Sequence, residues 1–252
     1  MKYSYHSHTR WCNHADGEIS DYIEEAVRQG FELFTICDHT PDDQNPFGPR
    51  ASWQDLPAYL QAVQKAEEQY SGRIRLLRGF EAEYYPEMMH RYQELKDQNG
   101  FQVWILGQHE SADHRLNYYH MKDLDAEIRQ YTADLLDGLA TGFFPVLAHP
   151  DLVILDCPGH RPVPVFLDCM RQLFAYCEAH QIVVELNANG FRGGKGYPCR
   201  EVWEMSREYH LRYLISSDAH APVQLNDRYV AQTEQFAEQL GIHPEEQIRW
   251  QR

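Results

Sequence analysis

The chain has 252 residues, of which 43% are hydrophobic and 24% are charged, and its formal net charge at pH 7 is −15. This acidic balance argues against binding to a nucleic-acid duplex or to an anionic membrane surface, because both depend on clusters of Lys and Arg. The N-terminal residues lack a signal-peptide pattern, and no apolar run approaches the roughly 20 residues that cross a bilayer. We therefore expect a cytoplasmic protein with one domain, residues 1–252, that binds a small molecule.

Short apolar runs alternate with longer amphipathic segments along the chain. The runs predicted to be strands cover residues 2–6, 32–37, 74–81, 101–108, 144–148, 181–186 and 211–216. The segments predicted to be helices cover residues 20–30, 53–70, 86–98, 123–139, 165–180 and 199–208. The first of these helices has Ser20 in the N-cap position and Gly30 at its end. Repeated βα units of this kind build a parallel sheet, so we predict an α/β fold.

Ionisable side chains stand at the carboxyl ends of six of the seven predicted strands, and a further histidine follows in the first loop. In chain order they are His6, His8, His14, Asp38, His39, Glu81, His109, His149, Asp218 and His220. The carboxyl ends of the strands in a parallel barrel open on one face, so these side chains would converge there. Of the remaining histidines, His90, His180 and His210 fall in predicted helices, and we expect the others to be solvated, namely His114, His120, His160 and His243.

Histidine and carboxylate in this arrangement indicate a metal site. His6 and His8 lie two apart on an extended chain, which places both imidazoles on the same side, where one ion can bind both. Asp38 is a candidate hydrogen-bond partner that orients a neighbouring histidine ligand. Seven neutral imidazoles and two carboxylates around three divalent ions would leave about four positive charges, which favours an anionic substrate. Zn, Mn and Fe all accept these ligand types.

The ordered motifs resemble those of the PHP family of phosphoesterases, and within it the histidinol-phosphatase branch. They are H-x-H, a loop histidine, D-H, G-x-E, a histidine after the fourth strand, A-H-P and S-D-A-H, and they extend from His6 to His220. The resemblance implies a distorted seven-stranded TIM-like (βα)7 barrel and two to three divalent metal ions. It also implies the hydrolysis of a small phosphate ester by a hydroxide that bridges two of the ions.

The resemblance assigns roles to single residues as well. It places the first ion on His6, His8, Glu81 and Asp218, the second on Glu81, His109 and His149, and the third on His14, His39 and His220. Arg192 resembles an arginine that contacts phosphate in this branch, and Arg10 is a second candidate for that contact. Asp218 or a metal-bound water would give the proton to the leaving group.

Several alternatives remain open on the sequence. Acidic residues such as Asp16, Glu83 and Glu110 would suit the cationic groups of L-histidinol phosphate, and they would equally suit hydrogen bonds to histidine ligands. The motif G-Q-H-E around His109 departs from the better-known histidinol phosphatases, and the loop 110–122 matches no substrate-binding pattern of that branch. A nucleotide or sugar phosphate is therefore an alternative substrate. A metal-dependent amidohydrolase is an alternative of another class, but such enzymes often carry a lysine at a strand end that bridges two metals, and no lysine follows an apolar run here. A non-catalytic metal-binding module would be expected to lack some of the nine ligands, which are all present.

Overall fold

The structure is a computed structural model that describes residues 1–249. It contains seven strands in one sheet, in the order β1 to β7, and every neighbouring pair is parallel. The strands are β1 (Tyr3–Ser4), β2 (Leu33–His39), β3 (Arg75–Ala82), β4 (Val103–Leu106), β5 (Val146–Leu147), β6 (Val183–Asn187) and β7 (Arg212–Ser216). Each predicted strand is confirmed, and the observed strands are mostly shorter than the runs.

The sheet closes almost completely into a barrel. Ser7, just after β1, forms a parallel bridge with Ala219, just after β7. The main-chain N–H of His8 donates to the carbonyl of Ala219 at 2.7 Å. The predicted seven-stranded α/β barrel is therefore confirmed, and the segments that follow the first and last strands lie side by side at its carboxyl face.

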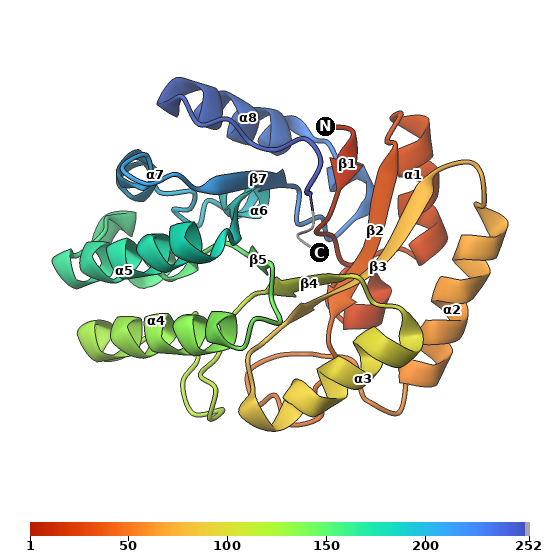
Figure 1. Ribbon diagram of the computed structural model, residues 1–252, viewed down its shortest axis with the longest axis horizontal. Coiled ribbons are helices and arrows are strands. Elements are labelled where there is room, and N and C mark those ends of the chain that lie inside the picture. Colours follow the sequence, from red (N-terminus) through yellow and green to blue (C-terminus); the bar gives the residue numbers. More distant parts are fainter. Residues whose placement is uncertain (250–252) are drawn as a thin grey trace.

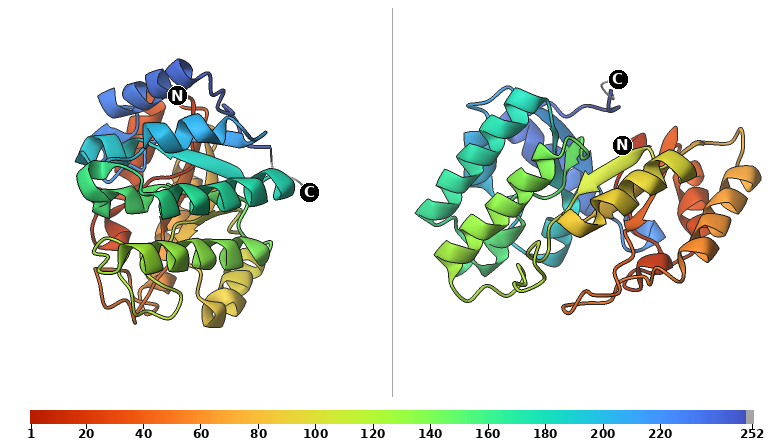
Figure 2. Two further views of the ribbon diagram at one scale, coloured as in Figure 1. Left: turned by 90° about the vertical axis from the view of Figure 1, so that its left-hand side faces the viewer. Right: turned by 60° about the horizontal axis from the view of Figure 1, so that its bottom comes forward.

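Helices surround the barrel, with α1 and α2 on one side and α4 and α5 on the other (Figures 1 and 2). The predicted helices appear as α1 (Ile19–Arg28), α2 (Leu56–Gln69), α3 (Met89–Asn99), α4 (Leu124–Ala140), α5 (Pro164–His180) and α7 (Arg200–Ser206). Two helices were not predicted, α6 (Ala188–Gly193) and α8 (Arg228–Leu240). Short 3-10 helices are η1 (Arg10–Cys12), η2 (Pro86–Met88), η3 (Leu152–Asp156), η4 (Pro158–His160) and η5 (Pro222–Gln224).

The predicted N-cap at Ser20 is wrong, because the N-cap residue of α1 lies two positions earlier, in a capping box. Glu18 is the N-cap residue, and its main-chain N–H donates to Asp21 Oδ2 at 2.8 Å. The unpredicted α8 begins at Asp227, whose carboxylate accepts from the main-chain N–H groups of Tyr229 and Val230. These two caps satisfy main-chain donors that a helix start leaves without a partner.

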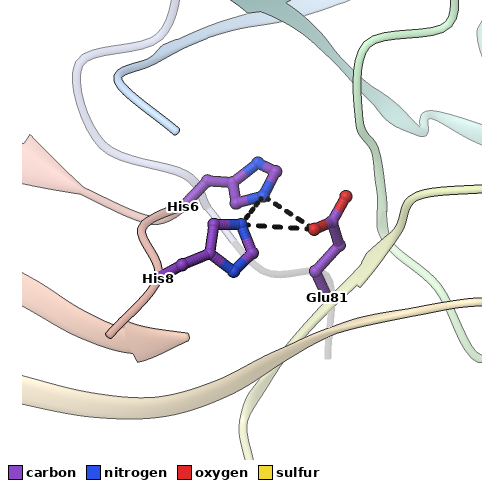
Figure 3. A group of neighbouring side chains, drawn as sticks. All are labelled: His6, His8 and Glu81. Atoms are coloured by element: carbon purple, nitrogen blue, oxygen red, sulfur yellow. Dashed lines mark hydrogen bonds and ion pairs between the residues drawn. The ribbon is translucent and has the colours of Figure 1, made fainter. Parts of the chain in front are cut away.

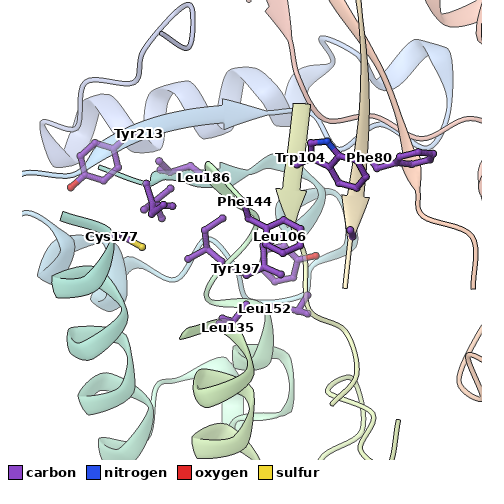
Figure 4. Close-up of a cluster of buried hydrophobic side chains, with 14 of the residues drawn as sticks. Phe80, Trp104, Leu106, Leu135, Phe144, Leu152, Cys177, Leu186, Tyr197 and Tyr213 are labelled. Carbon is purple, nitrogen blue, oxygen red and sulfur yellow. The ribbon is translucent and has the colours of Figure 1, made fainter. Parts of the chain in front are cut away.

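Alternation along the strands divides the core in two. On β2, Leu33 and Cys37 point into the barrel, whereas Phe34 and Ile36 pack against the helices. The outer layer is aromatic beside β3 and β4, where the rings of Phe80 and Trp104 lie 5.7 Å apart (Figure 4). In the inner cluster, Tyr5 and Ile248 pack together, and the N–H of Ile248 donates to the Tyr5 hydroxyl at 3.1 Å.

The same alternation directs two buried glutamates inward. Glu81 lies four residues after the inward-facing Leu77 on β3, and Glu185 lies two residues after the inward-facing Val183 on β6. Successive side chains of a strand alternate between its faces, so both carboxylates point into the barrel. These carboxylates are 1% and 0% exposed, which requires charged or hydrogen-bonding partners around them.

Within residues 1–249 no helix is long and apolar enough to cross a membrane. All six cysteines are buried, and none of them forms a disulfide.

Candidate metal centre

The nine predicted metal ligands gather at the carboxyl face of the barrel. Eight of them line a cavity of about 400 Å³, namely His8, His14, His39, Glu81, His109, His149, Asp218 and His220. His6 is fully buried beside them, so it contributes to the cluster from below the cavity wall. The convergence expected from strand ends therefore exists in the structure.

The carboxylate of Glu81 lies at the centre of this cluster. Its Oε2 is 3.2 Å from His6 Nε2 and 3.3 Å from His8 Nε2. Both imidazoles point toward this carboxylate in Figure 3. His39 Nε2 is also 3.2 Å from Oε2, because β2 and β3 pair His39 directly with Glu81. One oxygen of Glu81 thus faces three imidazoles.

The other oxygen of Glu81 faces a second pair of histidines. Its Oε1 is 2.9 Å from His149 Nε2 and 3.8 Å from His109 Nε2. Gly107, on the neighbouring chain segment after β4, leaves room for this carboxylate, since a Cβ there would lie 1.9 Å from Oε1. Glu81 therefore stands between two groups of imidazoles, which is the arrangement that a bridging carboxylate needs.

Asp218 approaches the same cluster from the end of β7. Its Oδ1 lies 3.0 Å from His8 Nε2 and 3.7 Å from His6 Nε2, and its Oδ2 accepts from the side-chain amides of Asn187 and Asn189. The φ of Asp218 is 42°, in the left-handed region that is uncommon for a residue with a side chain. Backbone strain of this kind is often found at functional sites.

Three imidazoles, those of His14, His39 and His220, surround His8. The ring centroids of His14 and His39 are 5.1 Å apart, as are those of His14 and His220, and His39 and His220 lie 4.5 and 4.6 Å from His8. The set that the family resemblance assigned to a third ion is therefore close together. His39 also contacts Glu81, so the three predicted sets share one continuous cluster rather than three separate sites.

Two buried glutamates orient the histidines from behind. Glu83 accepts from the main-chain N–H of His109 and lies 2.7 Å from its Nδ1. Glu185 lies 2.7 Å from His6 Nδ1 and accepts from the main-chain N–H of His149 at 3.1 Å. A carboxylate at Nδ1 fixes the ring and leaves Nε2 for a metal. Glu83 therefore serves as a histidine partner, one of its two predicted roles.

Sequence reasoning missed Glu185 and assigned Asp38 to the wrong partner. Glu185 stands in the middle of an otherwise apolar run, IVVELN, and this isolated charge was the feature that could have revealed it. Asp38 accepts from the N–H and the hydroxyl of Thr9, at 2.6 and 2.9 Å, instead of from a histidine. It holds the turn that follows His8.

The pKa values of the cluster reflect its carboxylates. Burial alone would lower the pKa of His6, but the charges of Glu185, Glu81 and Asp218 raise it well above its usual value. Burial would raise the pKa of Glu81, but the charges of the surrounding imidazoles hold it well below its usual value. This carboxylate is therefore ionised and strongly dependent on positive charge around it.

The outer histidines have the opposite shift. Burial, followed by the charge of His8, lowers the pKa of His14 to about 3 and that of His220 to about 4. Both imidazoles are therefore neutral at pH 7, and neutral imidazole is the form that binds a metal ion.

The residues present fit divalent metal ions. The Nε2 atoms of His6 and His8 lie 3.1 Å apart, and the buried Asp218 Oδ1 lies 3.0 Å from His8 Nε2, so nitrogen and oxygen ligand atoms converge on one point. Ligand atoms within 4.8 Å of one another form the groups His6, His8 and Glu81; Glu81, His109 and His149; and His8, Asp218 and His220. Nitrogen and carboxylate oxygen together suit Zn, Mn and Fe.

The structure does not place the two predicted phosphate-binding arginines on the cavity wall. Arg192 lies on α6, where it pairs with Asp227 at 2.9 Å and donates to the main-chain carbonyls of Ser217 and Gln224. Arg10 is half exposed and pairs with Glu18. The cations that do line the cavity are Arg50 and Lys195, which sequence reasoning did not select because neither comes directly after a predicted strand.

A nearly closed parallel barrel with histidines and carboxylates at its carboxyl face defines a metal-binding α/β barrel protein. The sequence profile of the PHP domain matches residues 4–189. The chain therefore belongs to the PHP-domain family, which confirms the resemblance inferred from its motifs.

Individual relatives agree with this membership. The chain is similar to a "probable histidinol-phosphatase" of Schizosaccharomyces pombe, with 24% identity over 91% of this chain and 84% of the relative. It is similar to another protein so named in Deinococcus radiodurans, with 25% identity over 89% of this chain and 88% of the relative. Its fold is similar to that of a histidinol phosphate phosphatase from Lactococcus lactis, which was solved with zinc, L-histidinol and phosphate. The TM-score is 0.74 and the sequence identity is 16%, and the match covers 96% of this chain and 95% of the other.

The change Glu185→Gln is expected to weaken metal binding about 10- to 100-fold, because the amide no longer supplies a charged acceptor to His6 Nδ1. Metal affinity is measured by titrating metal-free protein with Zn²⁺ or Mn²⁺ against a chelating indicator. The exposed Glu201→Gln on α7 provides the matched control. Unchanged affinity in Glu185→Gln would show that Glu185 does not support the metal centre.

Proposed function

We propose that the protein is a metal-dependent phosphomonoesterase of the histidinol-phosphatase type. The observation that supports this most strongly is the Glu81 carboxylate between two groups of imidazoles, in a cavity that also contains the guanidinium of Arg50. Metal ligands together with an arginine suit a phosphate dianion, since each supplies positive charge or charge-assisted hydrogen bonds. The names of the relatives in Schizosaccharomyces pombe and Deinococcus radiodurans support the same reaction class.

Two to three divalent ions, Zn, Mn or Fe, would be held by the nine residues that the family resemblance selected. Bound ions of this kind lower the pKa of a water to near 7 and withdraw charge from phosphoryl oxygens, which supplies a nucleophile at neutral pH. His6, His8, Asp218 and Glu81 would hold one ion, Glu81, His109 and His149 a second, and His14, His39 and His220 a third.

Arg50 is our candidate for the phosphate contact. Its side chain is 11% exposed, and its ion pair with Glu83 is loose, with 3.6 Å between Nη2 and Oε1. Several N–H donors of the guanidinium can therefore turn toward a phosphoryl group in the cavity. Arg192 is instead a positioning residue. It donates to the carbonyl of Ser217, which precedes Asp218, and lies 3.4 Å from the side-chain oxygen of Asn189.

Asp218 is the second residue to which we assign a catalytic role. Burial raises its pKa, but the charge of His6 and the hydrogen bond from His8 bring it well below the usual value. The carboxylate is therefore ionised at neutral pH, and its Oδ1 faces the imidazoles of His8 and His6, at 3.0 and 3.7 Å from their Nε2 atoms. An ionised carboxylate suits metal binding and acceptance of a proton from the attacking water better than donation to the leaving group.

L-Histidinol phosphate is the substrate that we propose, and with it a place in histidine biosynthesis in the cytoplasm. The support is the names of the two relatives and the L-histidinol and phosphate in the Lactococcus lactis structure. A nucleotide or sugar phosphate is the alternative substrate, and a metal-dependent amidohydrolase or a non-catalytic metal-binding module is the alternative of another class. Phosphate release from a panel of esters, with the metal content determined in parallel, distinguishes them.

The changes His109→Ala and Asp218→Ala are each expected to reduce phosphate release to the uncatalysed background, because each removes a metal ligand. Circular dichroism should show that the fold is retained, since both side chains lie at the carboxyl face rather than in the apolar core. Near-full activity in either variant would refute the assignment of the site.

The change Arg50→Met is expected to lower kcat/KM for phosphate esters about 100-fold, because it removes charge-assisted donors from a partly buried site. Inorganic phosphate should also inhibit the variant less strongly. Arg171→Met, an exposed position on α5, is the matched control. If Arg50→Met keeps the wild-type constants and Arg192→Met loses them, the phosphate contact belongs to Arg192 as the sequence predicted.

A further inference from the structure

Glu110 is a buried carboxylate that the proposed catalysis does not use. It lines the cavity beside the metal centre, and the residue is 1% exposed. Its Oε2 accepts no hydrogen bond from any residue that the structure describes. A buried oxygen without a donor is costly, so its retention next to a cavity requires an explanation.

The other oxygen of Glu110 is held firmly. Its Oε1 accepts from the hydroxyl of Tyr85 and lies 3.1 Å from His114 Nδ1. The rings of Tyr85 and His114 stack with 4.2 Å between their centroids, so the two partners also fix each other. His114 was expected to be solvated and is instead part of this support. Rotation of the carboxylate would break both contacts, so Oε2 keeps its position.

The main chain around Glu110 is fixed as well. Its carbonyl accepts from Gln108 Nε2 at 2.8 Å, and Glu110 forms an antiparallel bridge with Asn117 within the loop 110–122. Asn117 and Tyr119 line the same cavity, and the ring of Tyr119 stacks on that of the predicted ligand His109. The loop 110–122 therefore forms a wall of the cavity that continues from the metal centre to Glu110.

The charge around Glu110 is negative. Its neighbour His114 also lies 3.2 Å from Glu87, so a single imidazole is shared between two carboxylates. Within residues 1–249 no Lys or Arg forms an ion pair with Glu110, and the nearby Glu83 already uses Arg50 and His109. A positively charged group in the cavity would supply the missing donor and reduce this excess.

We propose that Glu110 Oε2 binds a cationic nitrogen, an ammonium or imidazolium, on the organic part of the substrate. The enzyme would thereby select phosphomonoesters that also carry a positive charge. This inference rests on the proposed phosphomonoesterase function and names the specificity of the same site: Arg50 and the metal ligands receive the phosphate, and Glu110 receives the cation. Tyr85 and His114 are positioning residues for this contact.

The variant Glu110→Gln tests the proposal with little change in shape. Glutamine retains an acceptor for Tyr85 and His114 but replaces the unpaired oxygen with an NH₂ group, which repels a cation. For L-histidinol phosphate we expect kcat/KM to fall about 10- to 100-fold, mainly through KM, since a hydrogen bond to a charged group has about this effect. For the uncharged-alcohol ester 4-nitrophenyl phosphate we expect no change beyond about twofold.

A binding measurement gives a readout that does not depend on turnover. Calorimetric affinity for L-histidinol should fall by a similar factor in Glu110→Gln, and the metal content should equal that of the wild type. Glu94→Gln, an exposed position on α3, is the matched control and should behave as the wild type.

The possible results distinguish the role of Glu110 from the proposed phosphomonoesterase function. An equal loss on both esters, reduced metal content, or unchanged affinity for L-histidinol would overturn the role of Glu110 while the phosphatase activity of the wild type still stood. Failure of fully metallated wild-type protein to hydrolyse either ester would overturn the proposed function and with it this inference.

Discussion

The carboxylate of Glu81 is the interaction on which the site depends. A single ionised side chain, 1% exposed, faces His6, His8 and His39 with one oxygen and His109 and His149 with the other. A charge so deeply buried is tolerated only with positive or strongly donating partners around it. The surrounding barrel supplies those partners from the carboxyl ends of its strands, and room for the carboxylate comes from the absence of a side chain at Gly107.

A second level of carboxylates makes this arrangement rigid. Glu185 joins His6 to the main chain of His149, and Glu83 holds both the main chain and the ring of His109. Because these glutamates lie on or next to strands, the imidazoles they orient are fixed by the sheet itself and not by mobile loops. The cluster therefore presents its Nε2 atoms in a prepared arrangement, which reduces the reorganisation that metal binding requires.

The loops add what the barrel alone lacks. Arg50 reaches the cavity from the segment between β2 and α2, and Glu110 reaches it from the loop after β4. In our proposal these two side chains of opposite charge distinguish the phosphate from the cationic part of one substrate. This division agrees with the general behaviour of α/β barrels, in which strand ends carry the chemistry and the loops set specificity.

The sequence by itself determined the seven strands, most of the helices and the set of residues that meet at the carboxyl face. Its short apolar runs and strand-end histidines are local patterns, and parallel strands bring their ends together whatever the details of packing. Only the tertiary structure decided which residues touch. Some of these contacts join segments that are distant in the chain, as between Glu185 and His6 or between Asp38 and Thr9. Others depend on the path of a loop. These are the place of Arg50, instead of Arg192, on the cavity wall and the support of Glu110 by Tyr85 and His114. Loop paths and side-chain directions follow from packing across the whole barrel, which no local spacing encodes.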